Sequence, residues 1–122
     1  FEDDSVEEFY LGYTLLHIRP AYRGKLLAEV LRALSPTGFV TFREVAMDSV
    51  MMEWLIEPSQ RTSELIWGEL GSVHGPELAA YDTHHWGYTR QTLWQTLLAA
   101  GFRNLSYGED PEPHSFMLRG RK

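Results

Sequence analysis

The sequence predicts an α/β fold in which parallel strands are followed by an antiparallel carboxyl-terminal strand pair, with helices on both faces of the sheet. A continuous apolar run at residues 9–16 is typical of a strand that is covered on both faces. A strand, a helix and a second strand then follow within about 35 residues, which is the spacing of a right-handed βαβ unit. A short polar turn joins the last two predicted strands, as in an antiparallel pair.

The first predicted strand, residues 9–16, is rich in β-preferring aromatic side chains. A short buried helix is the alternative interpretation, but the run is short for a helix. Pro20 stands where a proline can open a helix. We expect that helix over residues 21–34, because its leucines recur on one face and its charged residues lie elsewhere.

The second predicted strand covers residues 39–45, after a Ser-Pro-Thr-Gly turn at 35–38 that ends the helix. Strand alternation places Val40, Phe42 and Glu44 on one face, and the residues between them on the other. The crossover connection predicts that this strand runs parallel to the first.

The central part of the chain is predicted to combine short helices with an irregular loop. Asp48 and Ser49 can cap a helix that ends near Pro58, and residues 60–70 can form another helix. Residues 71–83 are rich in Gly, Pro and Ala, which predicts a long loop of the kind that often carries function.

The carboxyl-terminal part predicts one more helix and two strands. Thr89 is expected to be the helix N-cap, and Gly101 the left-handed residue after its last turn. Residues 102–107 and 114–119 predict the strands, because the Pro-containing turn between them cannot lie inside a strand. We find no repeat or linker, so residues 1–122 are expected to form a single domain.

Composition excludes several classes of function. The net charge is −6, which argues against non-specific binding to nucleic acid. The chain has no cysteine, so disulfides and thiolate chemistry are excluded. No apolar run reaches the roughly 18 residues of a membrane span, and no signal-peptide pattern is seen. We therefore expect a cytoplasmic protein with neither nucleic acid nor membrane as a partner.

The first residue, Phe1, is an unusual start for a protein. Initiator Met is normally removed only before a small residue, so we expect a fragment, a proteolytic product or a protein with a further portion upstream of Phe1.

Four segments resemble, in the same order, class I S-adenosylmethionine-dependent methyltransferases. Residues 7–17 are similar to the family's fourth strand and the turn after it, with Leu16 where the family usually has Glu. Residues 26–38 resemble its leucine-rich helix and the following Leu-Lys-Pro-Gly-Gly turn, although the Lys and one Gly are missing. Residues 66–69 and 85–102 resemble an Ile-Tyr-Gly-Gly segment and a His-Trp-Gly-Tyr-Thr turn of one bacterial branch.

The resemblance implies a partial Rossmann-like methyltransferase sheet that contains strands four to seven of the family. The chain would be the second half of the domain, without the first half that carries the Gly-rich cofactor loop. The implied cofactor is S-adenosylmethionine, and this half would supply one wall of its site, at the carboxyl end of the first strand. The residues of that wall would be Tyr10, Leu11, Gly12 and Tyr13.

Residues 84–88, His-His-Trp-Gly-Tyr, are the densest cluster of polar and aromatic side chains. A histidine titrates near neutral pH and can act as a general base, while the aromatic rings can form flat pocket walls. We predict catalytic roles for His85 and Tyr88. The predicted substrate-binding residues are Trp67, Glu69, His84 and Trp86. The alternative is a structural lid, in which Trp86 packs on the core.

A metal site is not predicted. His74, Asp82, His84 and His85 are the only candidate ligands, and the adjacent histidines of an extended chain point apart. His17 follows the first strand, and the resemblance implies a structural role for it, bonded to nearby backbone.

Three hypotheses about function follow. The first is a methyltransferase, or a fragment of one, that acts on a small-molecule substrate. The second is an inactive methyltransferase-like module, whose exposed first strand pairs with a second copy, a protein partner or a missing amino-terminal half. The third is an unrelated small α/β ligand-binding domain. Stabilisation by the cofactor would separate the first hypothesis from the second.

Overall fold

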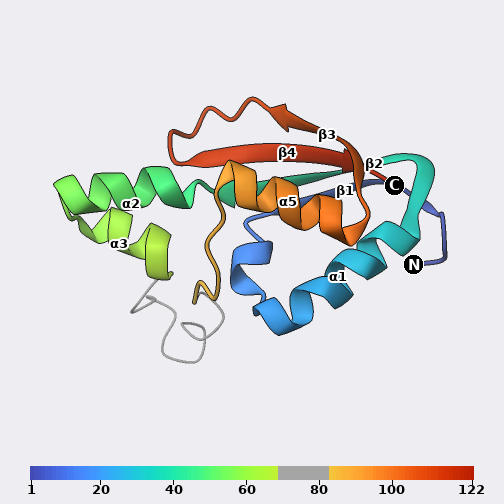
Figure 1. Ribbon diagram of the computed structural model, residues 1–122, viewed down its shortest axis with the longest axis horizontal. Coiled ribbons are helices and arrows are strands. Elements are labelled where there is room, and N and C mark those ends of the chain that lie inside the picture. The colour runs from blue at the N-terminus through green and yellow to red at the C-terminus, as the bar shows by residue number, and fades with distance from the viewer. Residues whose placement is uncertain (69–82) are drawn as a thin grey trace.

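The computed structural model describes residues 1–68 and 83–122. The elements, in chain order, are β1 (Val6–Gly12), η1 (Leu15–His17), α1 (Pro20–Ala33), β2 (Leu34–Val45), α2 (Met47–Ile56), α3 (Gln60–Trp67), α5 (Arg90–Ala100), β3 (Arg103–Gly108) and β4 (Ser115–Arg121) (Figure 1).

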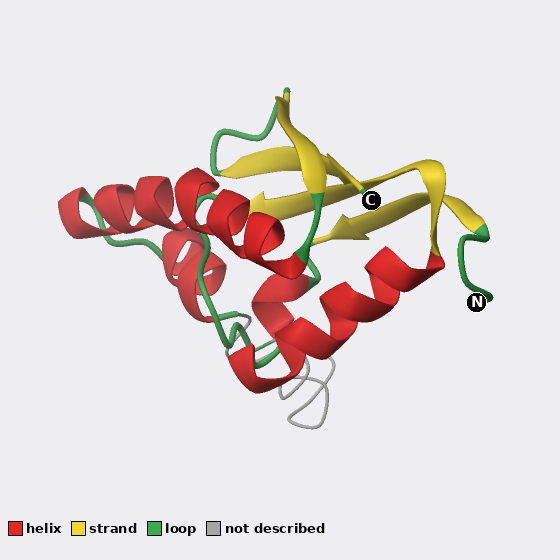
Figure 2. Cartoon of the chain, turned by 45° about the vertical axis from the view of Figure 1, so that its right-hand side comes forward, coloured by secondary structure: helices red, strands yellow, loops and turns green. Residues whose placement is uncertain are grey.

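The sheet has four strands in the order β1-β2-β4-β3. β1 and β2 are parallel, and β4 is antiparallel to both β2 and β3. Figure 2 shows the helices gathered below this sheet and at one end of it. The predicted α/β fold, with a parallel pair followed by an antiparallel pair, is therefore confirmed.

The first strand ends earlier than the sequence predicted. β1 stops at Gly12, and Leu15 and Leu16 belong to the short helix η1. Tyr13 adopts a left-handed backbone with φ of 51°, which ends the strand. The prediction of one strand over residues 9–16 is wrong, because this apolar run is divided between β1 and η1. Leu15 and Leu16 are buried, but Tyr10 is 58% exposed, so β1 is not covered on both faces.

The turn predicted at residues 35–38 lies inside β2, which starts directly after α1. The pairing with β1 moves from Val6–Leu34 to Glu8–Phe39, so a bulge accommodates the extra residues. The Glu7 carboxylate accepts hydrogen bonds from the hydroxyl groups of this bulge. Gly38 is required there, because a Cβ atom would lie 2.8 Å from the Glu7 carbonyl oxygen.

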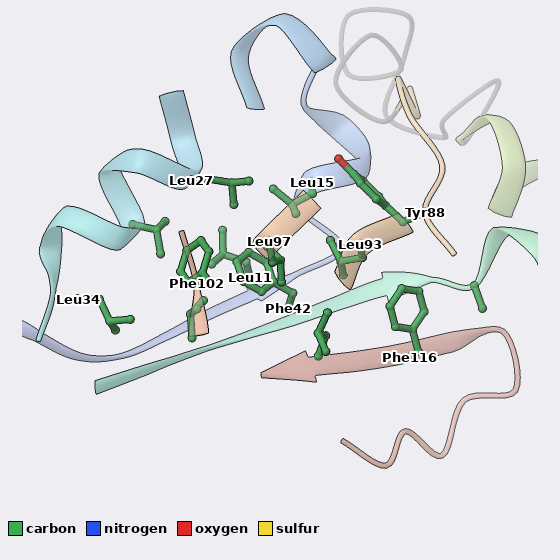
Figure 3. Packing of buried hydrophobic residues seen from close by; sticks show 14 residues of the cluster. Leu11, Leu15, Leu27, Leu34, Phe42, Tyr88, Leu93, Leu97, Phe102 and Phe116 are labelled. Atoms are coloured by element: carbon green, nitrogen blue, oxygen red, sulfur yellow. The ribbon is translucent and has the colours of Figure 1, made fainter. Parts of the chain in front are cut away.

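The main hydrophobic core lies between the sheet and the helices α1 and α5 (Figure 3). Alternation places Val40 and Phe42 of β2 on this face, as predicted, and both are fully buried. The rings of Phe42 and Phe102 meet edge to face, with centroids 5.8 Å apart. The core residues contributed by the two helices are Leu27, Val30, Leu93 and Leu97.

A second, smaller core forms at the carboxyl ends of β1 and β2. It contains Leu16, Val45, Val50 and Ile66, and it seats α2 and α3. Because Val45 follows the inward-facing Glu44, its side chain points to the other face of the sheet. The main cluster therefore holds α1 and α5 against one face of the sheet, whereas the smaller cluster holds α2 and α3 beyond its end.

Capping residues predicted from the sequence located the ends of one helix correctly and the start of another incorrectly. Thr89 caps α5 in a capping box with Thr92, and Gly101 ends it with φ of 108°, as predicted. The predicted cap of α2 was wrong, because the N-cap residue is Ala46 and it makes no side-chain cap bond. No helix in the described ranges is both long and apolar enough to cross a membrane.

The packing of the core predicts that two neighbouring leucines of α5 contribute very differently to the free energy of unfolding. Leu97 is completely buried, whereas Leu98 is 45% exposed. Leu97→Ala should lower the free energy of unfolding by about 2–5 kcal/mol, because it leaves a cavity in the core. Leu98→Ala, the control, should change it by about 0.5 kcal/mol. Urea unfolding of the two variants measures this, and equal effects would contradict the packing described here.

Candidate functional site

The carboxyl ends of β1 and β2 meet the segment that precedes α5. Leu16 is the anchor, since its carbonyl oxygen accepts hydrogen bonds from the backbone N–H groups of His85 and Trp86, at 2.7 and 3.2 Å. Tyr88 continues the edge of the sheet, because it forms a parallel bridge with Ala46. The fold thus brings the predicted residues His84, His85, Trp86 and Tyr88 to the edge where ligands bind in open α/β sheets.

Glu44 is a residue of this edge that sequence reasoning did not select. It is completely buried, and its Oε1 accepts a hydrogen bond of 2.9 Å from the backbone N–H of Leu15. Its Oε2 has no hydrogen-bond partner in the described part of the chain. Burial raises the pKa of the Glu44 carboxyl to about 8, against the opposing hydrogen bonds from the backbone. The signal in the sequence was a carboxylate on the apolar face of a strand.

Tyr88 lies between this carboxyl and a cation. The ring belongs to the main core and is 1% exposed. Figure 3 shows its hydroxyl group at the margin of the core, pointing away from the sheet. Arg23 Nη1 donates a 3.1 Å hydrogen bond to that hydroxyl. Burial also raises the pKa of the Tyr88 phenol, so the group stays protonated near neutral pH. Its predicted catalytic role stays a prediction.

The side chains of His17 and His84 contact backbone around the same edge. His84 Nδ1 lies 2.9 Å from the Leu65 carbonyl oxygen, and His17 Nδ1 lies 3.2 Å from the Thr83 carbonyl oxygen. The rings of His17 and His84 are 5.0 Å apart. His17 therefore bonds to nearby backbone, as the resemblance implied. His85 is half-buried.

Two predicted substrate-binding tryptophans are accessible. Trp67 ends α3 and is 54% exposed, and Trp86 is 48% exposed. Glu69, which was also predicted to bind substrate, lies outside the described residues. The metal candidates His74 and Asp82 lie outside them as well. Within residues 1–68 and 83–122, no group of three or more possible metal ligands is found.

The predicted cofactor wall is partly accessible. Tyr10 is exposed, and its ring covers Gly12, where an added Cβ atom would lie 2.7 Å from the Tyr10 ring. Leu11 points into the main core, so only its backbone could face a ligand. An exposed ring beside a residue without a side chain fits one wall of a nucleoside site. In the described part of the chain, no Gly-rich loop links a strand to a helix to supply the second wall.

Tyr13 is held from the opposite face of the sheet. Its hydroxyl group lies 2.7 Å from Ser115 Oγ, and the Arg43 guanidinium lies 5.0 Å from its ring. Arg43 donates two hydrogen bonds to Asp110, at 2.7 and 2.8 Å, and the Asp110 side chain is only 2% exposed. These hydrogen bonds hold the pKa of the Asp110 carboxyl below its usual range. The turn after β1 is therefore fixed by β2 and by the β3–β4 turn.

No family model matches the sequence, and no curated protein matches it. Solved structures do match. A SAM-dependent methyltransferase from Archaeoglobus fulgidus has a TM-score of 0.64 at 12% identity, over 100% of this chain and 62% of its own. One from Thermotoga maritima, described as a possible histamine N-methyltransferase, has a TM-score of 0.66 at 15% identity, over 99% of this chain and 57% of its own.

A third similar structure contains ligands. It is the 1,6-didemethyltoxoflavin-N1-methyltransferase of Burkholderia thailandensis, with bound 1,6-didemethyltoxoflavin and S-adenosylhomocysteine. It has a TM-score of 0.64 at 17% identity, over 100% of this chain and 46% of its own. The chain thus spans about half to three fifths of the length of these three proteins.

Glu44 predicts an unusual dependence of stability on pH. Its carboxyl has a higher pKa in the folded chain, about 8, than in the unfolded chain. Its contribution to stability is therefore complete below the unfolded pKa and is lost as the pH rises through about 8. Glu44→Gln should abolish this loss, which approaches about 1.4 kcal/mol per pH unit. Urea unfolding from pH 5 to 8 measures it. Equal slopes for both proteins would contradict the burial of Glu44.

The ion pair between Arg43 and Asp110 is predicted to stabilise the folded chain. Asp110→Asn should lower the free energy of unfolding by about 1.5–3 kcal/mol, because charged hydrogen bonds to Arg43 are lost. Since the Asp110 pKa is lowered, this contribution is present at neutral pH and is lost as the pH falls through the folded pKa. Glu109→Gln, a change at the exposed neighbour, is the control. An Asp110→Asn variant as stable as that control would show that the pair does not fix the turn.

The similarity extends over nearly the whole of this chain and includes the mixed sheet with its antiparallel carboxyl-terminal strands. At these identities it establishes the fold. The chain has the α/β fold of S-adenosylmethionine-dependent methyltransferases, over part of their length.

Proposed function

We propose that this chain is the carboxyl-terminal half of an S-adenosylmethionine-dependent methyltransferase that acts on a small molecule in the cytoplasm. The observation that supports this most is the meeting of residues 84–88 with the carboxyl ends of β1 and β2. A chain with this fold from Burkholderia thailandensis holds both S-adenosylhomocysteine and a small methyl acceptor. The agreement of site position and fold favours methyl transfer over other reactions of α/β proteins.

The residues divide between two sides of the proposed site. Tyr10 and the backbone from Leu11 to Tyr13 would contact the cofactor. When bound, S-adenosylmethionine supplies a methyl group on a positively charged sulfur. His85 would hold or accept a proton of the methyl acceptor, because it is half-buried and lies on the same edge. The protein's main contribution would be to position the reactants.

The free edge of β1 supports the place of this chain in a longer sheet. In the described part of the chain, β1 pairs with β2 alone. An edge strand with an exposed Tyr10 is suited to accept a further strand. We infer that the missing half of the cofactor site would be contributed by the segment that pairs there. A module that binds a second copy through the same edge is the alternative.

A cofactor titration tests this proposal. The test uses the chain joined to the segment that pairs with β1, because that segment would complete the cofactor site. S-adenosylhomocysteine should bind and raise the thermal stability of this protein, because a ligand of the native state alone stabilises it. Tyr10→Leu should weaken the affinity roughly 2–10-fold, by loss of aromatic contact. The control is Tyr22→Leu on α1, because Tyr22 is similarly exposed, at 64%. Calorimetry measures the affinities.

Two outcomes would count against methyl transfer by this chain. In the first, S-adenosylhomocysteine does not bind and sedimentation shows a dimer, which would favour the partner-binding module. In the second, Tyr22→Leu weakens binding as much as Tyr10→Leu, which would remove the assigned cofactor wall.

A further inference from the structure

A cleft of about 640 Å³ is lined by residues of α1, of α5 and of the segment before α5. Both helices cover the side of the sheet that holds the main core (Figures 1 and 2). Its volume is within the range of sites for small organic molecules. Trp86 and Gly87, from the proposed substrate segment, lie at its border. The other lining residues are Pro20, Arg23, Gly24, Leu27, Thr92, Gln95, Thr96, Ala99 and Ala100.

Arg23 is the single charged residue in this lining. The chain has a net charge of −6, so a cleft with one cation and no acid departs from its average surface. Elsewhere in the described ranges, Arg32 and Arg43 form ion pairs with carboxylates. Arg23 makes no ion pair with a carboxylate in those ranges. Its positive charge is therefore available to a ligand.

The guanidinium group of Arg23 is held in position before any ligand arrives. It donates a hydrogen bond to the Tyr88 hydroxyl, at 3.1 Å. It also lies 5.9 Å from the ring centroids of both Trp86 and Tyr88. A guanidinium has five N–H groups, so the bond to Tyr88 leaves others for an anion. A group held in this way loses little conformational freedom on binding.

The buried carboxyl of Glu44 does not cancel this charge. It acts on Tyr88 from within the core, and it is largely protonated at neutral pH, because burial raises its pKa to about 8. The half-exposed ring of Trp86 supplies a flat apolar surface beside the cation. Charge and shape together favour a ligand that is both planar and negatively charged.

We propose that this cleft binds a planar aromatic carboxylate, whose carboxylate group contacts Arg23 and whose ring contacts Trp86. Arginine and carboxylate are matched in planar geometry, and their charged hydrogen bonds are strong. The proposal deepens the proposed function and rests on it, because the bound anion would be the methyl acceptor. The binding site itself requires only the residues of α1, α5 and the segment before α5.

The test compares 2-naphthoate with its neutral analogue 2-naphthamide, by calorimetry at low ionic strength and without cofactor. The chain should bind 2-naphthoate about tenfold more tightly, as expected for charged hydrogen bonds. Arg23→Gln should remove this preference. Lys25→Gln removes the same charge from the same helix, at an exposed position outside the cleft, and should leave the affinity unchanged.

Trp86→Leu provides an independent measurement, because Trp86 is half-exposed and its replacement spares the core. It should weaken 2-naphthoate roughly 2–10-fold by loss of ring contact, with Arg23 unchanged. Thermal unfolding followed by circular dichroism verifies that each variant is folded. If Arg23→Gln does not fold, Trp86→Leu and the response to salt decide. Added salt should weaken the binding of 2-naphthoate and leave the binding of 2-naphthamide unchanged.

Several results would overturn the proposal. One is equal affinity of the chain for 2-naphthoate and 2-naphthamide. Another is that Arg23→Gln and Lys25→Gln change the affinity for 2-naphthoate equally. A third is that neither Trp86→Leu nor added salt changes that affinity. The cofactor titration is separate. If 2-naphthoate binds as expected but S-adenosylhomocysteine does not, the anion site stands and the methyltransferase proposal fails. If the reverse is found, the methyltransferase proposal stands and the substrate class fails.

Discussion

The hydrogen bond between the Glu44 carboxyl and the backbone N–H of Leu15 is the contact on which the candidate site depends. β1 must turn sharply into η1 inside the core, and this turn leaves a buried N–H group that needs an acceptor. Glu44 supplies that acceptor from the neighbouring strand. With η1 in place, the carbonyl oxygen of Leu16 can hold His85 and Trp86. A buried carboxyl thus helps to determine where residues 84–88 lie.

Arg43 and Arg23 differ in whether a carboxylate neutralises their charge, and this difference separates a structural arginine from one that can bind an anion. Arg43 is bonded to Asp110 and covers Tyr13, so its charge is neutralised within the protein and serves to fix a turn. Arg23 is bonded to a neutral hydroxyl and lies beside two rings, so its charge is directed to the cleft. The first arrangement stabilises the fold. The second is suited to recognise an anion.

The proposed methyl transfer would suit a site of this kind, because the protein would mainly have to position two reactants. The fold places the exposed ring of Tyr10 near the end of β1 and the half-buried His85 on the same edge. Both lie where α/β sheets bind ligands. The chain spans only part of the length of the similar methyltransferases, so a complete cofactor site would need a second wall beside β1.

The sequence by itself determined the features that depend on neighbouring residues: the βαβ order, the alternation of β2 with Glu44 turned inward, and the left-handed Gly101 after α5. The tertiary structure alone decided where β1 ends, because the left-handed Tyr13 and the bond from Glu44 to the following turn involve distant strands. It also decided that Arg23 lies beside Trp86, 63 residues later in the sequence, for which no local pattern exists. Periodicity and capping report short-range preferences, whereas the chemistry of this edge comes from contacts between segments that only folding brings together.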